Sequence, residues 1–472
     1  MQTHIVPTED IRRIHLIAVC GTGMGALACM LKDSGYTVTG SDQHVYPPMS
    51  EFLRTKGIEL FEGFDPRHLA DETDLVVVGN AVSKDNPEVR AMQQRRLAFC
   101  SMPQAINQFA AAGKKQIVVT GTHGKTTTSS FIAWMLQYAG LDPSFLIGGI
   151  LGNFSSNYRV GKGDWIVLEG DEYDTAFFDK GPKFLHYSPR MAVLTSVEFD
   201  HADIYVDLKH VQHAFGRMVE ALSDDAKLLV FDGDRNIDPL LPQAQCEVIP
   251  YGHKHDSAWR LGEVRIEPPY TRFEVYQGNR RYAEFKAKMI GEHNLYNLLS
   301  GIGIGFALGL DAATIGGALD HFQGVRRRQE VRGVKRDIVV IDDFAHHPTA
   351  VKATLAAVKS FYHPRRVIAV FEPRTNSSRR NIFQASYAES FDAADLICIR
   401  QPPLLEKIPP AQRFSSEQLV TDLQKRGKNA LYFPDTDAIL NYLAAQANPR
   451  DVILVMSNGG FDNIHSRLLN IL

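Results

Sequence analysis

Residues 118–128 constrain the fold of this 472-residue chain more than any other segment. Residues 116–120 are mostly apolar and β-branched, glycines follow at Gly121 and Gly124, and residues 129–137 continue with helical spacing. Because glycine adopts backbone conformations closed to other residues, the pattern predicts a buried strand, a tight turn and a helix. Free amides and the helix dipole favour negative charge at such a helix start. The segment therefore predicts a site for a nucleoside triphosphate.

The turn departs from the general phosphate-binding loop, whose glycines are five residues apart and not three. Lys125 is nevertheless expected to reach the β- and γ-phosphates, and the Thr126 hydroxyl to bind Mg²⁺. A plain glycine-rich turn would explain Gly124 and Lys125, but not the flanking strand and helix. The expected ATP-binding residues of this loop are Gly121, Thr122, His123, Gly124, Lys125, Thr126 and Thr127.

Composition narrows the class of protein. The length suits about three domains, each with its own core. The net charge of -3 argues against binding to nucleic acid, which requires a basic surface. The five cysteines are scattered and never form a CxxC pair, which argues against a disulfide framework or a structural zinc site. We see neither a signal peptide nor an apolar run that could span a membrane, so we expect a cytoplasmic protein without membrane or nucleic-acid partners.

A second glycine-rich turn lies near the start of the chain. Residues 14–19 form an apolar run, Gly21, Gly23 and Gly25 follow, and Asp42 comes about 20 residues after the turn, as in a Rossmann-like dinucleotide site. Two other interpretations stay open at this point. The turn could serve an NAD-dependent dehydrogenase, or it could be purely structural.

Acidic residues follow two further predicted strands. Residues 165–168 lead to Glu169 and the acidic run 171–174, and residues 191–196 lead to the run 198–203, which contains His201. Because parallel strands bind ligands at their carboxyl ends, we expect these groups to share one edge with the glycine-rich loop. A solvated acidic loop is the alternative. Mg²⁺ prefers oxygen ligands, so Thr126 and Glu169 are predicted to hold it, with His201 serving a second ion.

The loop Gly-Thr-His-Gly-Lys-Thr-Thr, the residues 80–83 and the run 198–203 resemble the Mur ligase superfamily of ATP-dependent, amide-forming enzymes. The resemblance covers nearly the whole chain and implies an α/β fold of three domains. These are a Rossmann-like domain over residues 1–107, a central P-loop ATPase-type domain over 108–324 and a second Rossmann-like domain over 325–472, which binds the peptide substrate. In this family the first domain holds a UDP-sugar and not NAD. The implied UDP-sugar-binding residues are Gly21, Thr22, Gly23, Met24, Asp42, Asn80, Ala81, Val82 and Ser83.

The resemblance also assigns roles farther along the chain. It places Asn294 at the adenine, Arg328 at a phosphate, Asp343 at the ribose and His346 near the reacting groups. From the residues alone, Asn294 would be a helix cap, and Arg328 part of a solvated run of arginines. The neighbours His346 and His347 invite a zinc hypothesis, which the spacing disfavours because no cysteine or acidic partner lies at metal-site distance along the chain.

Substrate choice within the superfamily is implied by four stretches, residues 46–50, 171–180, 371–377 and 456–460. They resemble the member that recycles peptidoglycan by joining L-alanyl-γ-D-glutamyl-meso-diaminopimelate to UDP-N-acetylmuramate through an acyl phosphate. Arg374 and Arg379 are candidates for binding the peptide carboxylates, since a planar guanidinium pairs well with carboxylate, although either could be a surface charge.

Lys125, His201 and His346 are the predicted catalytic residues, Mg²⁺ the predicted cofactor and ATP the co-substrate. Domain closure about residues 323–330 is expected to exclude water from the acyl phosphate. The alternatives are a ligase that adds L-alanine to UDP-N-acetylmuramate and a sensor that binds ATP and UDP-sugar without turnover. The sequence makes no prediction of oligomeric state.

Overall fold

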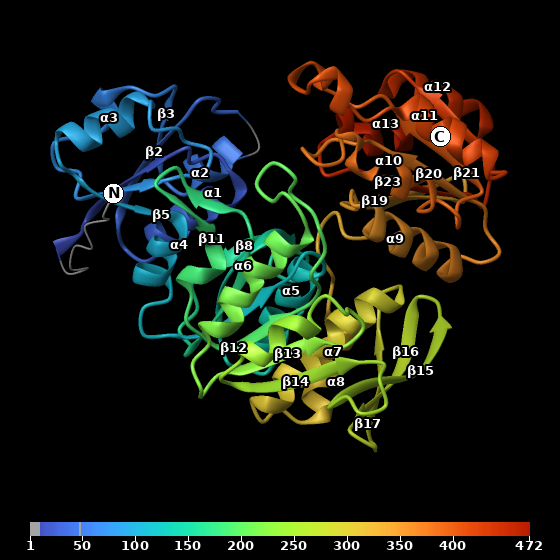
Figure 1. Ribbon diagram of the computed structural model, residues 1–472, viewed down its shortest axis with the longest axis horizontal. Coiled ribbons are helices and arrows are strands. Elements are labelled where there is room, and N and C mark those ends of the chain that lie inside the picture. Colours follow the sequence, from blue (N-terminus) through green and yellow to red (C-terminus); the bar gives the residue numbers. More distant parts are fainter. Residues whose placement is uncertain (1–9, 47–48) are drawn as a thin grey trace.

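The computed structural model describes residues 10–46 and 49–472 of the chain. Three separate sheets follow one another in sequence, and Figure 1 places the central one, in green and yellow, below the N-terminal and C-terminal ones. Pro47 and Pro48, within the stretch 46–50, lie outside the described residues, as do residues 1–9. The structure thus has the α/β fold that the sequence predicts.

The N-terminal sheet has five parallel strands in the order β3-β2-β1-β4-β5. Its elements are β1 (Arg13–Ile17), α1 (Thr22–Asp33), β2 (Thr37–Asp42), α2 (Met49–Thr55), β3 (Glu59–Glu62), β4 (Leu75–Val78), α3 (Pro87–Gln94) and β5 (Ala98–Ser101). The strand order reverses between β1 and β4, which is where such sheets bind ligands. The turn after β1 and the loop 79–83 after β4 both lie at this point.

The segment 102–114 connects the first two domains as a short helix followed by a linker. Helix α4 (Met102–Ala105) begins with a capping box at Ser101, a π-helical turn continues it over Ile106–Ala110, and β6 (Lys115–Thr120) follows after four residues. Ile106 is buried in a cluster that contains residues of both the N-terminal and the central domain. The connecting segment therefore packs against both domains.

The central sheet has ten strands in the order β17-β16-β15-β14-β13-β12-β6-β9-β7-β8. The strands after β6 are β7 (Ser144–Leu151), β8 (Ser156–Arg159), β9 (Trp165–Gly170), β12 (Pro189–Leu194), β13 (Lys227–Phe231), β14 (Glu247–Gly252), β15 (Trp259–Glu267), β16 (Tyr270–Gln277) and β17 (Arg280–Ala287), and β10 (Asp174–Ala176) with β11 (Asp179–Pro182) forms a separate hairpin. The helices are α5 (Lys125–Tyr138), α6 (Leu208–Glu220), α7 (Glu292–Ala307) and α8 (Ala312–His321).

Alternating side chains of the central strands pack on opposite faces of the sheet. Val193 of β12 lies in a buried cluster with residues of α5, α7 and α8, whereas its neighbour Leu194 lies in one with residues of α6. Strand β6 runs between β12 and β9, parallel to both. The carboxyl ends of these three strands therefore meet at one edge, as the sequence predicts.

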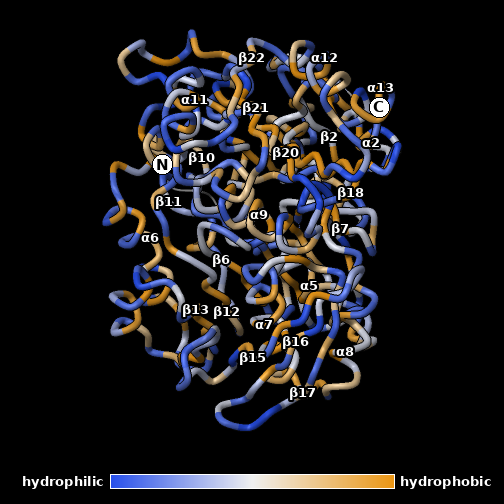
Figure 2. The backbone as a smooth tube through the Cα atoms, turned by 90° about the vertical axis from the view of Figure 1, so that its right-hand side faces the viewer, coloured by the Kyte–Doolittle hydropathy of each residue, from blue (hydrophilic) through white to orange (hydrophobic). Residues whose placement is uncertain are grey.

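The C-terminal sheet has the order β18-β19-β23-β20-β21-β22, and only its edge strand β18 is antiparallel to its neighbour. Its elements are β18 (Glu330–Lys335), β19 (Ile338–Asp343), α9 (Pro348–Phe361), β20 (Val367–Phe371), α10 (Gln384–Ala388), β21 (Leu396–Arg400), α11 (Ser416–Lys425), β22 (Ala430–Phe433), α12 (Thr436–Gln446), β23 (Val452–Met456) and α13 (Ile464–Ile471). Figure 2 shows hydrophobic residues along inner strands such as β20, in keeping with parallel strands buried on both faces. Within residues 10–46 and 49–472, no helix is long and apolar enough to cross a membrane.

The linker between the last two domains pairs with the central sheet. Val325 forms a bridge with Leu151, and the Arg326 N–H donates to Ile150 O at 2.9 Å. Arg327 and Gln329, which follow, have φ angles of 61° and 51°, a region that such residues seldom adopt. The linker is thus fixed to the central domain up to Arg326 and turns sharply immediately afterwards.

Candidate active site

The loop between β6 and α5 needs glycine at two positions. Gly121 has a φ of 126° and Gly124 one of 82°, both in the left-handed region. A Cβ on Gly121 would overlap Thr195 Oγ1, and one on Gly124 would overlap Asn297 Oδ1. Other residues would therefore be strained at both positions and would collide with their neighbours. The close packing places the first amides of α5 at the edge of the sheet.

Lys125 begins α5 and lies among carboxylates. Its Nζ donates to Glu172 Oε2 at 2.8 Å and to Gly121 O at 2.5 Å. Burial by itself would lower the pKa of the Lys125 ammonium, but the charges of Glu172, Asp171 and Glu169 outweigh burial and raise it. The lysine therefore stays protonated at the loop, as binding to phosphate requires.

Thr126, in the first turn of α5, contacts Glu169 at the end of β9. The Thr126 hydroxyl donates to Glu169 Oε1 at 3.0 Å, and the Gly148 N–H donates to Glu169 Oε2 at 2.8 Å. A hydroxyl and a carboxylate at the phosphate loop are the hard oxygen donors that Mg²⁺ prefers. The residues present thus fit the cation that the sequence predicts.

His201 follows β12 in a left-handed conformation, with a φ of 54°. Its Nε2 lies 3.1 Å from Glu172 Oε1, so the carboxylate that binds Lys125 also binds this imidazole. Burial would lower the pKa of His201, but Glu172 and Asp200 raise it. The ring packs edge-on against Tyr173, with centroids 4.4 Å apart.

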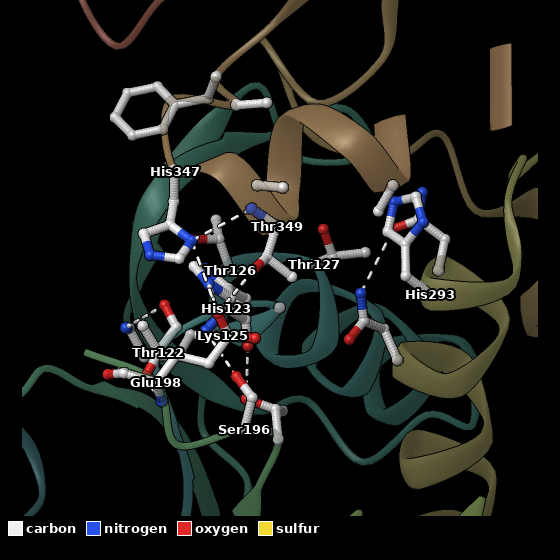
Figure 3. A pocket seen from close by; sticks show the side chains of 18 of the residues that line it. Thr122, His123, Lys125, Thr126, Thr127, Ser196, Glu198, His293, His347 and Thr349 are labelled. Atoms are coloured by element: carbon white, nitrogen blue, oxygen red, sulfur yellow. Dashed lines mark hydrogen bonds and ion pairs between the residues drawn. The ribbon is translucent and has the colours of Figure 1, made fainter. Parts of the chain in front are cut away.

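A cavity of ≈ 460 Å³ lies between the central and C-terminal domains and gathers the predicted ATP-binding, metal-binding and catalytic residues except Gly121. The predicted residues that line it are Thr122, His123, Gly124, Lys125, Thr126, Thr127, Glu169, His201, Asn294, Arg328, Asp343 and His346. Figure 3 shows the loop side chains below α9, with His293 on the opposite side. One cavity therefore extends from the phosphate loop to the C-terminal domain.

Several lining residues have no counterpart among the predictions. Phe231, Tyr251 and Tyr296 form an aromatic wall, with the Phe231 ring centroid 5.7 Å from that of Tyr251 and 4.8 Å from that of Tyr296, and His293 also lines the cavity. Burial is the main reason that the pKa of His293 is lowered to about 4, and His123 lowers it further. His293 and Tyr296 flank Asn294 in sequence and could have been suggested by it, whereas nothing near Phe231 marks that residue.

Asn294 is not a helix cap. Gly291 precedes α7, and Asn294 lies in its first turn, where its Nδ2 donates to Ile290 O at 2.9 Å and to Gln329 Oε1 at 3.0 Å. The capping interpretation is wrong because the side chain reaches toward the linker instead of the free amides. Asn294 thereby connects α7 to the turn that carries Arg328.

Arg328 extends from the linker to the loop. Its Nη2 lies 3.4 Å from Thr126 Oγ1, and its guanidinium lies 4.6 Å from the centre of the Phe344 ring. Arg327 Nη2 donates to Ser457 O and to Gly459 O, both at 2.6 Å. Only Arg326 of the three arginines is exposed, so the alternative of a solvated charge run is wrong.

Asp343 and His346 lie at the end of β19. Asp343 Oδ2 accepts the Gln329 N–H and its Oδ1 the Ala345 N–H, both at 2.7 Å. Burial raises the pKa of this carboxyl despite the opposing charge of Arg328. His346 Nε2 lies 3.8 Å from Asp200 Oδ2, across the boundary between the two domains.

The predicted UDP-sugar residues lie apart from this cavity, on the N-terminal sheet. Asp42 Oδ2 accepts the Cys20 N–H at 2.8 Å and so stabilises the glycine-rich turn. Asn80, Ala81 and Ser83 are exposed in the loop after β4, whereas the Val82 side chain is buried, so only its backbone can face a ligand. Helix α1 begins directly after Gly21, and its first turn contains Thr22, Gly23 and Met24. These residues are gathered at one sheet edge, but none is among the described lining of the cavity.

Arg374 and Arg379 follow β20 and also lie outside the described cavity lining. Arg374 Nη1 lies 3.6 Å from Glu372 Oε2, and Arg379 Nη2 donates to Asn376 Oδ1 at 2.9 Å. Asn376 in turn donates to Asp203 Oδ2 of the central domain at 3.1 Å. The loop of the two arginines therefore borders the same domain boundary as the cavity.

The chain thus forms three α/β domains, and a glycine-rich phosphate-binding loop lies at the edge of the central sheet. This arrangement is that of a nucleotide-binding α/β protein. Family models match three consecutive segments, described as Mur ligase family, catalytic domain (residues 13–114), Mur ligase middle domain (119–305) and Mur ligase, glutamate ligase domain (327–459). The chain belongs to the Mur ligase family.

Similar proteins extend over the full length of the chain. The UDP-N-acetylmuramate–L-alanyl-γ-D-glutamyl-meso-2,6-diaminoheptandioate ligase of Escherichia coli is 38% identical, over 97% of this chain and 98% of that protein. A UDP-N-acetylmuramate–L-alanine ligase of Clostridium botulinum is 31% identical, over 98% of each. The crystal structure of a murein peptide ligase from Psychrobacter arcticus has 33% identity, covers 98% of each chain and superposes with a TM-score of 0.71.

Proposed function

We propose that this protein is an ATP-dependent, ADP-forming ligase that joins L-alanyl-γ-D-glutamyl-meso-diaminopimelate to UDP-N-acetylmuramate. The observation that carries the proposal is the convergence of Lys125, Thr126 and Glu169 in a cavity closed by the C-terminal domain. The substrate assignment is supported by the higher identity to the E. coli tripeptide ligase, 38%, than to the L-alanine ligase, 31%. The reaction belongs to peptidoglycan recycling.

We assign the ATP to the cavity between the central and C-terminal domains. The aromatic wall and His293 would take the adenine, near Asn294, and Asp343 the ribose. The phosphates would lie at the amides of residues 121–127, with Arg328 beside them. Mg²⁺ would be held by Thr126 and Glu169, and His201, beside Glu172, would serve a second ion. When bound, Mg²⁺ neutralises charge on the β- and γ-phosphates.

The remaining sites are assigned by domain. We propose boundaries at 1–107, 108–324 and 325–472, which the three separate sheets support. The turn 21–24, Asp42 and the loop 80–83 would bind the UDP-sugar at the point where the N-terminal strand order reverses. Arg374 and Arg379 would bind carboxylates of the peptide in the C-terminal domain.

The chemistry follows from charge. Lys125 and the loop amides reduce the repulsion between the muramate carboxylate and the γ-phosphate. A carboxylate oxygen attacks the γ-phosphorus, and the bond from that phosphorus to the β–γ bridging oxygen breaks. The products of this step are an acyl phosphate and ADP. The peptide amine then attacks the acyl carbon, loses a proton, and expels inorganic phosphate as the amide forms. His346, held near Asp200 at the domain boundary, lies where it can orient the amine or accept its proton.

Water must be kept from the acyl phosphate, and the linker offers a means. The chain is paired with β7 up to Arg326 and then turns at Arg327 and Gln329. Rotation at these residues would close the C-terminal domain on the bound substrates. Identical X-ray scattering profiles for the free and fully liganded protein would contradict this closure.

The test is phosphate release with ATP, Mg²⁺ and UDP-N-acetylmuramate, offering the tripeptide, L-alanine or no amine in parallel. Release that depends on the tripeptide is expected. Release with L-alanine alone would move the assignment to that ligase and leave the mechanism intact. Silence with every amine, together with tight ATP binding, would instead favour a sensor without turnover. Lys125→Met is the control for contaminating activity.

A further inference from the structure

Three side chains that are remote in sequence meet where the phosphate loop faces the C-terminal domain. His123 belongs to the loop after β6, Glu198 follows β12, and His347 precedes α9. Glu198 Oε2 lies 3.6 Å from His123 Nε2 and 3.6 Å from His347 Nδ1, and the three ligand atoms lie within 4.8 Å of one another. Figure 3 shows the group below the start of α9.

These separations suit a tetrahedral metal ion. Zinc binds histidine nitrogen and carboxylate oxygen at about 2.0–2.1 Å, which makes the edge between two ligands of a tetrahedron roughly 3.4 Å long. The two edges at Glu198 are 3.6 Å, close to this value, and the third pair of ligand atoms lies within 4.8 Å, so a bound ion would draw the two imidazoles together. Two imidazoles and one carboxylate leave a fourth position for water or a phosphate oxygen.

An unpaired atom also points to a ligand. His123 Nε2 is buried and has no hydrogen-bond partner among the described residues. Leaving such a group unpaired costs about 1–3 kcal/mol, so native proteins seldom retain one without an ion or water beside it. The unpaired nitrogen is the same atom that lies 3.6 Å from Glu198 Oε2. A metal ion between the two would pair it.

The state of His347 suits metal binding as well. Its Nε2 lies 3.2 Å from the Phe199 carbonyl oxygen, which can only accept a hydrogen bond, so Nε2 carries the proton. The lone pair of the neutral ring is then on Nδ1, the nitrogen that lies 3.6 Å from Glu198 Oε2. Metal-binding histidines commonly donate their second nitrogen to a carbonyl in this way. Nδ1 accepts a long bond from the Thr349 N–H at 3.3 Å, which a metal ion would displace.

The Glu198 carboxylate is oriented by a neighbouring hydroxyl. The Thr349 hydroxyl donates to its Oε2 at 2.7 Å. This carboxylate supplies an oxygen ligand and the negative charge that a divalent cation needs.

We propose that His123, Glu198 and His347 form a site for a divalent transition-metal ion of the zinc type, separate from the Mg²⁺ site at Thr126 and Glu169. Imidazole selects zinc, cobalt or nickel over magnesium, which prefers oxygen. Since two ligands come from the central domain and one from the C-terminal domain, the ion ties the domains together at the phosphate loop. Its binding therefore restrains opening of the cavity.

The experiment is a titration of the full-length protein with Co²⁺ in excess Mg²⁺, without nucleotide. One equivalent of tetrahedral Co²⁺ is expected, recognised by its intense visible d–d bands without thiolate charge transfer, and displaced by Zn²⁺. His347→Ala and Glu198→Gln should each weaken binding at least ~10-fold, as loss of a ligand requires. His346→Ala is the matched control, because that neighbouring histidine faces Asp200 and not the cluster.

A second measurement reports whether the ion holds the central and C-terminal domains together. Zn²⁺ should slow proteolytic cleavage of the linker 323–330 in the original protein and leave the rate unchanged in His347→Ala. Thermal melts show whether each variant is folded. Absence of the tetrahedral bands overturns the proposal, as do bands that survive in the folded His347→Ala and Glu198→Gln variants. Bands lost instead with His201→Ala would place the ion at the nucleotide site and also overturn it.

Discussion

Lys125 Nζ lies 2.8 Å from Glu172 Oε2, and the other oxygen of the same carboxylate lies 3.1 Å from His201 Nε2. The side chain of Glu172 is 2% exposed. One buried carboxylate thus contacts both Lys125 and His201 beside the phosphate loop. We expect triphosphate binding to replace this carboxylate on Lys125 by phosphate oxygens.

Two variants separate the contribution of the Lys125–Glu172 pair to stability from its contribution to catalysis. Lys125→Met leaves Glu172 buried with one partner fewer, which should destabilise the protein by about 1–3 kcal/mol. Lys125→Met combined with Glu172→Gln should recover most of that loss, because the unpaired charge is gone. Both variants should lose at least ~100-fold in phosphate release, since neither restores the ammonium. Urea unfolding and the release assay measure the two effects, and a double variant as unstable as the single one would contradict the assignment.

The loop glycines should not tolerate a side chain. Gly124→Ala places a Cβ against Asn297 Oδ1 at a φ of 82°, so loss of nucleotide binding is expected, measured by calorimetry with ADP. Gly140→Ala is the control. Gly140 has a similar φ of 76°, and no described atom lies within 4 Å of the added Cβ. It should cost about 1–2 kcal/mol of stability from backbone strain alone and leave ADP binding intact.

Glu169 should determine the requirement for Mg²⁺. Glu169→Gln keeps the shape but removes the charge, so the Mg²⁺ concentration for half-maximal rate should rise at least ~10-fold. Asp225→Asn, in the exposed loop before β13, should leave the Mg²⁺ dependence unchanged. An unchanged dependence in Glu169→Gln would place the ion elsewhere.

His293 predicts how stability depends on pH. Its native pKa of about 4 lies below the value near 6.5 of an unfolded histidine. Between these two values the unfolded chain binds a proton that the native protein does not, so this contribution to stability is present above pH 6.5 and is lost as the pH falls toward 4. His293→Gln should therefore lose less stability between pH 7 and pH 5 than the original protein. Urea midpoints across this range measure the difference, and parallel curves would contradict it.

Arg374 and Arg379 should affect the peptide and not the nucleotide. Arg374→Gln removes a guanidinium that is 38% exposed, beside its contact to Glu372, and so accessible to a substrate carboxylate. The KM for the tripeptide should therefore rise about 10-fold or more, with the KM for ATP unchanged. Arg379 also donates to Thr375 O of its own loop and to Leu404 O of the loop after β21, so Arg379→Gln should additionally lower thermal stability. Equal effects on both substrates would indicate a general disturbance of the domain.

Much of the architecture was determined by local sequence. The strand, turn and helix around Gly121 and Gly124, the acidic residues after β9 and β12, and the alternation of strands and helices all follow from side-chain periodicity and glycine conformation. These properties act between residues close in the chain. They were sufficient to predict the α/β fold and the place of Lys125, Thr126 and Glu169 at the cavity, whereas the cavity residues of the linker and of the C-terminal domain were assigned by the resemblance.

Tertiary structure alone decided which distant groups meet. Phe231 joins the aromatic wall, Asn294 reaches Gln329 instead of capping its helix, and the segment 102–115 is shaped by the packing of two domains. His347 has no metal-site partner along the chain, yet the docking of the C-terminal domain brings it to His123 and Glu198. Strand order and domain contact create these neighbours, and both depend on packing over the whole chain, which no local pattern encodes.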